Sequence, residues 1–111
     1  MRSIAIGVIM LMAGISHRAL AQAPDGKALY EANCKKCHGV LGNPPKAIKE
    51  QFPKVATFDG PFIATHTEDS IVTIMTRGKG EDMKSFKGKL THAEMAAIAA
   101  YVHALATRPR P

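Results

Sequence analysis

The chain has 111 residues with a net charge of +6, and 46% of its residues are hydrophobic and 22% charged. This length and composition fit one globular domain, and they exclude a disordered chain, a pair of ordinary domains and an acidic carrier. Four Phe, two Tyr and no Trp leave a thin core of side chains for this length, and two cysteines exclude a disulfide-rich scaffold.

The amino-terminal segment has the features of a secretory signal peptide. Arg2 supplies a positive charge, and residues 4–15 form an apolar run that is shorter than the roughly 20 residues of a membrane-spanning helix. Ala19 and Ala21 form the small-x-small pattern of a cleavage site. We therefore expect residues 1–21 to be a cleaved signal peptide and residues 22–111 to be one periplasmic or otherwise exported domain without a transmembrane anchor. An uncleaved anchor or a buried helix is the alternative.

Three segments of the mature chain have the apolar spacing of helices. The first covers residues 27–33 after a turn in which Asp25 or Gly26 can cap it. The second covers residues 68–77, with Thr65 and Thr67 as candidate caps and Gly78 as its end. A capping-box pattern from Thr91 to Glu94 opens the third, which runs to about residue 106. Its expected buried face consists of Met95, Ile98, Val102 and Leu105.

The segments between these helices have the composition of loops. Residues 39–61 contain four prolines and three glycines, which predicts a long irregular loop with one short helix near residues 46–52. Residues 79–90 form a second, polar loop. No strand pattern and no nucleic-acid-binding motif accompanies them. The sequence therefore predicts an all-α domain.

The residues with the most specific chemistry are Cys34, Cys37 and His38. A thioredoxin-type thiol pair would need a βαβ context, and a zinc site would need further ligands that a second cysteine pair normally supplies. A plain structural disulfide is the ordinary alternative. The remaining interpretation is covalent haem attachment, in which each cysteine bonds a haem vinyl group and the adjacent histidine ligates the iron. A covalent haem c would also supply the apolar body that a core with few aromatic residues lacks.

Three segments in a fixed order resemble the small bacterial class I cytochromes c: Cys34-Lys35-Lys36-Cys37-His38-Gly39, then Gly78 before Met83-Lys84-Ser85-Phe86, then Ala100-Tyr101-Val102. The resemblance covers about residues 26–105. It implies a cytochrome c fold, in which crossed N- and C-terminal helices, a middle helix and long loops surround one covalent haem. In such a fold Gly26, Tyr30 and Tyr101 match the helix crossing. The implied activity is one-electron transfer rather than enzymatic catalysis.

The second axial ligand of the iron is expected to be Met83. Met75 and Met95 lie on apolar helix stripes, where core packing explains them. Met83 lies in a polar loop without an amphipathic reason, and it matches the methionine of the family's Met-Pro-x-Phe segment. Lys84 replaces the proline of that segment, which lowers the rigidity expected of the loop. We therefore expect the metal ligands to be His38 and Met83, and the full haem site to comprise Cys34, Cys37, His38 and Met83.

Two further expectations concern histidines and prolines. His66 is the rival for bis-histidine ligation, whereas His92 and His103 are expected at solvent and at a helix edge. The resemblance also implies that His38 donates its other ring N–H to a proline carbonyl, best matched by Pro53 and otherwise by Pro44 or Pro45.

Lysines flank both proposed haem segments. They are Lys35, Lys36, Lys84, Lys87 and Lys89. If both segments border an exposed haem edge, these lysines would steer larger redox proteins with an acidic docking surface, and an ordinary solvated surface is the alternative.

The sequence thus predicts a soluble, exported monohaem cytochrome c that carries single electrons between redox proteins and is not itself an enzyme. Two alternatives stay open. One is a haem-based gas-binding or sensor protein whose Met83 is displaced, and the other is a docked electron-transfer subunit of a dehydrogenase or oxidase.

Overall fold

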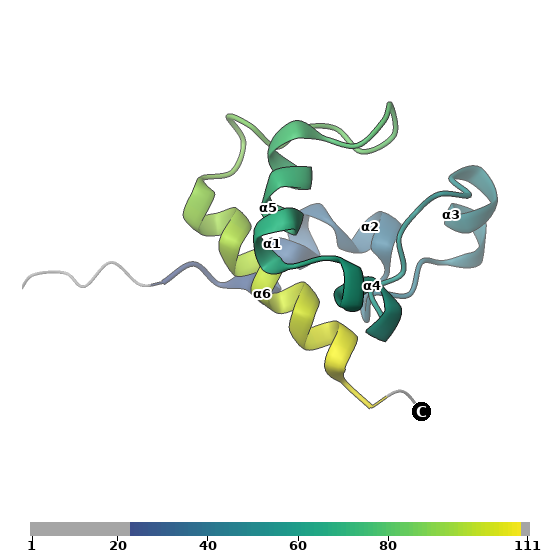
Figure 1. Cartoon of the computed structure of the whole chain (residues 1–111). Helices are drawn as coiled ribbons and strands as arrows, with labels where there is room; N and C mark the ends of the chain where they lie inside the picture. The colour runs from purple at the N-terminus through teal and green to yellow at the C-terminus, as the bar shows by residue number, and fades with distance from the viewer. Residues whose placement is uncertain (1–22, 110–111) are drawn as a thin grey trace, which may run out of the picture.

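The computed structural model describes residues 23–109, and the expected signal peptide lies outside them. The described residues contain helices and two isolated β-bridges but no strand, which confirms the all-α prediction (Figure 1). In chain order the helices are α1 (Gly26–Asn33), α2 (Lys35–His38), α3 (Lys46–Gln51), α4 (Gly60–Thr65), α5 (Glu68–Arg77) and α6 (His92–Thr107). None of the described helices is both long and apolar enough to cross a membrane.

The three longer helices begin where their capping residues predict. The Asp25 carboxylate accepts a hydrogen bond from the Ala28 N–H at 3.1 Å, and the Thr67 hydroxyl accepts one from the Ser70 N–H at 3.1 Å. At α6, the Thr91 hydroxyl and the Glu94 carboxylate form the complete capping box. Each cap satisfies helix-end N–H groups that have no partner within the helix.

The sequence does not predict two of the short helices. The single turn α2 contains Cys37 and His38 and has Cys34 as its N-cap, and α4 begins at Gly60, inside the segment expected to be irregular. Pro61 lies in the first turn of α4, where its missing N–H has no helical partner to lose, and Asp59 caps the turn through the Phe62 N–H. The proline density therefore marks a helix start here as well as a loop.

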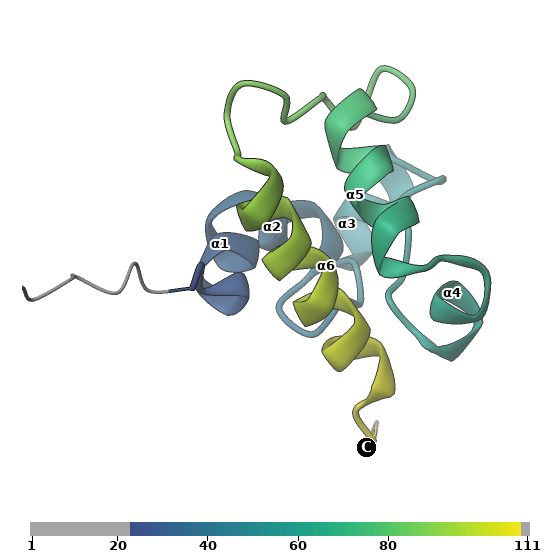
Figure 2. The same cartoon turned by 60° about the vertical axis from the view of Figure 1, so that its left-hand side comes forward.

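The core forms where α6 packs against both α1 and α5 (Figure 2). The α1–α6 crossing requires Gly26, because a Cβ at this position would lie 2.8 Å from the carbonyl carbon of Ala97 and 3.3 Å from the Cβ of Tyr101. Tyr30 is fully buried beside this crossing, with its ring centroid 5.2 Å from that of Tyr101. The buried face predicted for α6 is confirmed, because Met95, Ile98, Val102 and Leu105 are all buried.

Candidate functional site

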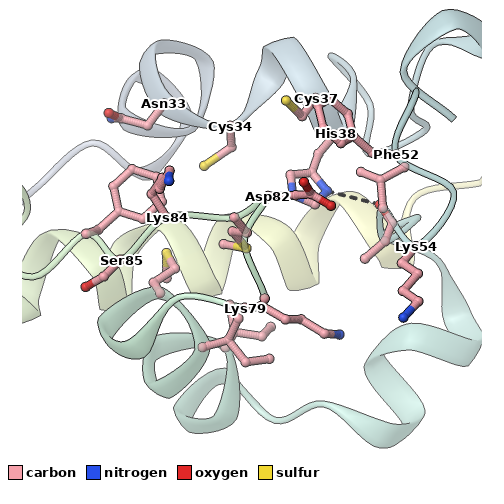
Figure 3. Close-up of a pocket in the computed structure, with 18 of the residues that line it drawn as sticks. Asn33, Cys34, Cys37, His38, Phe52, Lys54, Lys79, Asp82, Lys84 and Ser85 are labelled. Carbon is pink, nitrogen blue, oxygen red and sulfur yellow. Dashed lines mark hydrogen bonds between the residues drawn. The ribbon is translucent and has the colours of Figure 1, made fainter. Parts of the chain in front are cut away.

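A cavity of about 730 Å³ lies between α2, the segment after α3, α5 and the loop that follows α5. Its volume is within the range of sites for small molecules and cofactors. Figure 3 shows Cys34, Cys37 and His38 at the top of the cavity and Lys79 at the bottom. The apolar part of the wall comprises Phe52, Val55, Phe58, Phe62, Ile71, Ile74, Met75 and Phe86.

One helical turn brings the two cysteines and the histidine to the same wall. The Cys34 N–H donates to the Tyr30 carbonyl at the end of α1, and the His38 N–H donates to the Cys34 carbonyl at 2.9 Å. Residues three and four apart lie on one face of a helical turn, so Cys34 faces the same way as Cys37 and His38. All three side chains line the cavity.

The environment of Cys34 is unlike that of a redox-active thiol. Burial, with a smaller contribution from Cys37, raises the pKa of Cys34 to about 11. Reactive thiols in oxidoreductases have a lowered pKa, because the thiolate is the attacking species. The thiol of Cys34 is therefore protonated at neutral pH, which argues against the thioredoxin-type interpretation. The structure has no bond between the two cysteines, which disfavours the alternative of a structural disulfide.

The His38 ring is oriented by a hydrogen bond and by an aromatic neighbour. Its Nδ1 lies 3.0 Å from the Ala56 carbonyl oxygen, which requires Nδ1 to carry the proton and donate. The ring stacks on Phe58, with centroids 4.5 Å apart and planes 19° apart. Burial lowers the pKa of His38, and the Ala56 hydrogen bond opposes that shift. This neutral tautomer leaves the Nε2 lone pair for a metal ion.

The expectation that a proline carbonyl accepts from His38 is wrong. The acceptor is Ala56, three residues after Pro53. Pro53 is exposed within a turn closed by a 3.0 Å hydrogen bond from the Val55 N–H to the Phe52 carbonyl. The Ala56 carbonyl, which follows the turn, therefore faces the imidazole, and the Pro53 carbonyl within the turn does not.

Two of the three mature methionines border the cavity. Met83 is half-buried in the loop after α5 and packs against the core, whereas Met75 is 2% exposed on α5. Met95 is buried in α6 and is not among the lining residues. The Met83 loop closes through a 2.8 Å hydrogen bond from the Lys79 N–H to the Met83 carbonyl. Gly78 has a φ of 77°, and a Cβ there would lie 2.8 Å from both the Met83 carbonyl oxygen and the Ser85 nitrogen.

The remaining described histidines lie outside the cavity lining. His66 Nδ1 is 2.9 Å from the Phe62 carbonyl oxygen, and its ring stacks on that of Phe62. His103 Nε2 in turn contacts the His66 carbonyl at 3.0 Å, and His92 is exposed. The contacts of His66 and His103, and the exposure of His92, place all three side chains away from the cavity and disfavour the bis-histidine alternative.

The mouth of the cavity is rimmed by exposed charges. Four lysines line it, together with the carboxylates of Glu81 and Asp82: Lys54, Lys79, Lys84 and Lys89. Lys35, Lys36 and Lys87, which the sequence suggested for the same role, are exposed but do not line the cavity. Sequence reasoning missed Lys54, because only the fold brings the segment after α3 to the mouth, and it also missed Lys79 at the start of the loop after α5.

The residues fit a covalent haem: two thiols and a neutral imidazole face one large apolar cavity, and a thioether borders the same cavity. Sequence reasoning from the motif found these residues, but it missed Phe58 and Ala56, which orient the imidazole.

Comparison with known proteins gives the same family from sequence and from structure. Residues 21–102 match the family described as cytochrome C oxidase, cbb3-type, subunit III. Cytochrome c6 of Leptolyngbya boryana is 33% identical over 82 residues, which are 74% of this chain and 91% of that protein. Cytochrome c6 of Chlorolobion braunii is 36% identical over 85 residues, covering 70% of this chain and 84% of that protein.

Two further similarities come from an oxidase subunit and from a solved structure. The Cbb3-type cytochrome c oxidase subunit CcoP of Azospirillum brasilense is 27% identical, and the match spans 77% of this chain but only 29% of that protein. The solved structure of the KustC0563 c-type cytochrome has a TM-score of 0.67 and 33% identity, covering 75% of this chain and 99% of that one. The chain therefore belongs to the c-type cytochromes, as a small monohaem class I electron carrier with a covalently bound haem c.

Proposed function

We propose that this cytochrome is an exported one-electron carrier whose haem is bonded by Cys34 and Cys37 and whose iron is ligated by His38 and Met83. The observation that carries the proposal is that the turn with the cysteines and His38 and the loop with Met83 border the same cavity. Among the described methionines, Met83 alone combines half-burial, a place in the cavity wall and a position in a loop.

The haem, when bound, supplies the one-electron couple of its iron, and the protein supplies a fixed environment for it. The Ala56 carbonyl and the Phe58 ring hold the imidazole plane of His38. The hydrogen bond that the Ala56 carbonyl accepts from the Nδ1 N–H raises the basicity of Nε2. The Met83 thioether favours the ferrous state, and the apolar wall excludes water, so both raise the reduction potential. With His38 and Met83 as its protein ligands, the iron would exchange an electron without binding a substrate.

The ligand assignment is tested by comparing Met83→Ala with Met75→Leu in the haem-loaded protein. We expect Met83→Ala to lose the low-spin spectrum with sulfur ligation, to bind CO in the ferrous state and to have a lower reduction potential. Met75→Leu changes volume little, so it should keep the wild-type spectrum and cost less than about 1.5 kcal/mol of stability. A wild-type spectrum in Met83→Ala together with a changed one in Met75→Leu would show that Met75 is the ligand.

The proposal also includes export of the protein and its free diffusion between partners. Their support is the signal-peptide pattern of residues 1–21 and the similarity to cytochrome c6 proteins over most of their length. The proposed partners are larger redox proteins with an acidic surface complementary to the lysines at the cavity mouth. Amino-terminal sequencing of periplasmic protein tests export, and a mature chain beginning at Gln22 is the expected result.

A second candidate function is that of a docked subunit, because the matching family is named for a cbb3-type oxidase subunit. Gel filtration of a detergent extract separates the two functions. A free carrier elutes alone as a small monomer, whereas a docked subunit elutes with a large haem-containing assembly.

A further inference from the structure

The Met83 loop is attached to the carboxyl end of α5 by hydrogen bonds to the last carbonyl groups of that helix. The Ile74 carbonyl accepts from the Gly78 N–H at 2.7 Å, and the Met75 carbonyl accepts from the Phe86 N–H at 2.8 Å. The Thr76 carbonyl accepts from the Ser85 hydroxyl at 2.6 Å. A helix leaves its last carbonyls without helical partners, so the loop supplies the missing donors.

Among these donors, Ser85 is the only side chain, and both functions of its hydroxyl are used. The hydroxyl donates to the Thr76 carbonyl and accepts from the Lys87 N–H at 3.1 Å. It thereby joins the helix end to the loop backbone on the far side of Met83. On the near side, the bridge between Lys79 and Met83 holds the loop through backbone groups alone.

The position of this hydroxyl matters because Lys84 lies between it and Met83. A proline at residue 84 would restrict the backbone next to Met83 by fixing its own φ and by limiting the preceding residue. Lys84 is exposed and imposes neither restriction. The Ser85 hydrogen bonds therefore add a side-chain restraint to the backbone hydrogen bonds of Met83 and Phe86, at a place where no proline stiffens the chain.

We infer that Ser85 is the positioning residue for Met83: its hydroxyl anchors the loop to α5 and so sets how often the sulfur leaves the iron. This inference rests on the proposed ligation by Met83. Ser85 would thereby also limit how readily an external ligand binds the iron, because such a ligand binds only when the loop opens.

The size of the effect follows from the strength of one hydrogen bond. An ordinary hydrogen bond changes an equilibrium by about two- to ten-fold. Losing it in Ser85→Ala should raise the fraction of protein with dissociated Met83 by the same factor. Because an external ligand binds only that fraction, its apparent dissociation constant falls in proportion.

The experiment measures imidazole binding to the ferric haem-loaded protein by absorbance titration. We expect Ser85→Ala to bind imidazole about two- to ten-fold more tightly than wild type. Ser85→Thr keeps the hydroxyl and should bind like wild type. Ser70→Ala is the matched control, because the Ser70 hydroxyl donates to the Thr67 carbonyl at 2.9 Å at the other end of α5. Its imidazole affinity should be unchanged.

A double variant separates positioning from general stability. If Ser85 acts through Met83, adding Ser85→Ala to Met83→Ala leaves imidazole affinity unchanged, since no sulfur remains to compete. A merely structural Ser85 would lower the denaturation midpoint without changing imidazole affinity in the Met83-containing protein, and that result overturns the inference. If Met83→Ala itself binds imidazole like wild type, the ligand assignment fails instead, so the two failures are distinguishable.

Discussion

The two segments that face each other across the cavity are held in place by different means. In the attachment segment, residues 34–39, the hydrogen bonds from the Cys34, His38 and Gly39 amides each reach a carbonyl four residues earlier. In the Met83 loop, residues 78–86, the bonds reach back to α5, and the one from Ser85 to Thr76 spans nine residues. Local spacing therefore sets the geometry of the first segment, whereas the second depends on its docking to a helix.

The largest expected effect comes from removing the attachment chemistry. Replacing Cys34 and Cys37 with Ala should abolish covalent haem and leave little cooperatively folded protein. Without haem, the apolar wall of the cavity is exposed to water, and a domain of this size has little other core to stabilise it. Haem absorbance after denaturation, together with thermal unfolding followed by circular dichroism, provides the measurement.

The outcome that would contradict this prediction is normal helical content with a sharp unfolding transition in haem-free protein. Such a result would mean that the helix crossing of α1 and α6 alone stabilises the fold.

Two glycines distinguish the docked loop from the helix crossing. Gly78→Ala should cost about 1–3 kcal/mol, because φ is 77° there and the new Cβ meets the Met83 carbonyl oxygen and the Ser85 nitrogen. Gly26→Ala should cost a similar amount, about 1–3 kcal/mol, because its Cβ meets the Ala97 carbonyl. Denaturant unfolding measures both losses.

The spectra of these two variants should differ although their stabilities are similar. Gly78→Ala displaces the Met83 loop and should weaken the sulfur charge-transfer band, whereas Gly26→Ala acts at the distant crossing and should leave it intact. Equal spectral changes in both variants would show that the loop and the crossing move together.

A smaller effect is expected at Tyr30, which ties the attachment segment to α1. Its buried hydroxyl donates to the Gly39 carbonyl at 2.6 Å, so Tyr30→Phe should lower the free energy of unfolding by about 1 kcal/mol at neutral pH. Burial raises the pKa of Tyr30, followed by smaller contributions from Cys34 and Tyr101. The folded protein therefore holds this proton more tightly than the unfolded chain does.

The sign of the pH dependence follows from that difference. Tyrosine in the unfolded chain ionises near pH 10. The stabilisation from the Tyr30 hydroxyl is complete below that pH, and it declines as the pH rises toward the higher pKa of the folded protein. The difference in free energy of unfolding between wild type and Tyr30→Phe should therefore become smaller above pH 10. Urea unfolding at pH 7 and pH 11 measures this, and a constant difference would contradict the assignment.

The smallest expected effect comes from reversing lysine charges at the cavity mouth, compared with lysine charges in the attachment segment. Reversing the charge of Lys84 and Lys89, which line the cavity mouth, should slow reduction of hexacyanoferrate(III) several-fold at low ionic strength. Reversing Lys35 and Lys36, which are exposed outside the cavity lining, changes net charge equally and should matter less. Stopped-flow rates at low and high salt test this, because salt screens exposed charges. Equal losses from both pairs would mean that net charge alone controls the rate.

The features that could be predicted from sequence depend on residues close together in the chain. Asp25, Thr67 and the Thr91–Glu94 pair begin the helices where their side chains predict, because a cap bonds an amide two or three residues later. The motif of Cys34, Cys37 and His38 was equally legible, because one helical turn places all three on one wall. Met83 stands out in the sequence because a polar loop gives its side chain no packing reason.

The features that sequence did not reveal depend on which distant segment the fold brings near. The Ala56 carbonyl, rather than a proline carbonyl, meets His38, because the orientation of the turn after α3 decides which oxygen faces the ring. Phe58 and Lys54 reach the cavity through the same segment. Ser85 reads as an ordinary loop serine until α5 supplies the carbonyl it bonds. Local hydrogen bonds and helical periodicity are encoded by neighbouring residues, whereas these contacts exist only after separate segments have packed together.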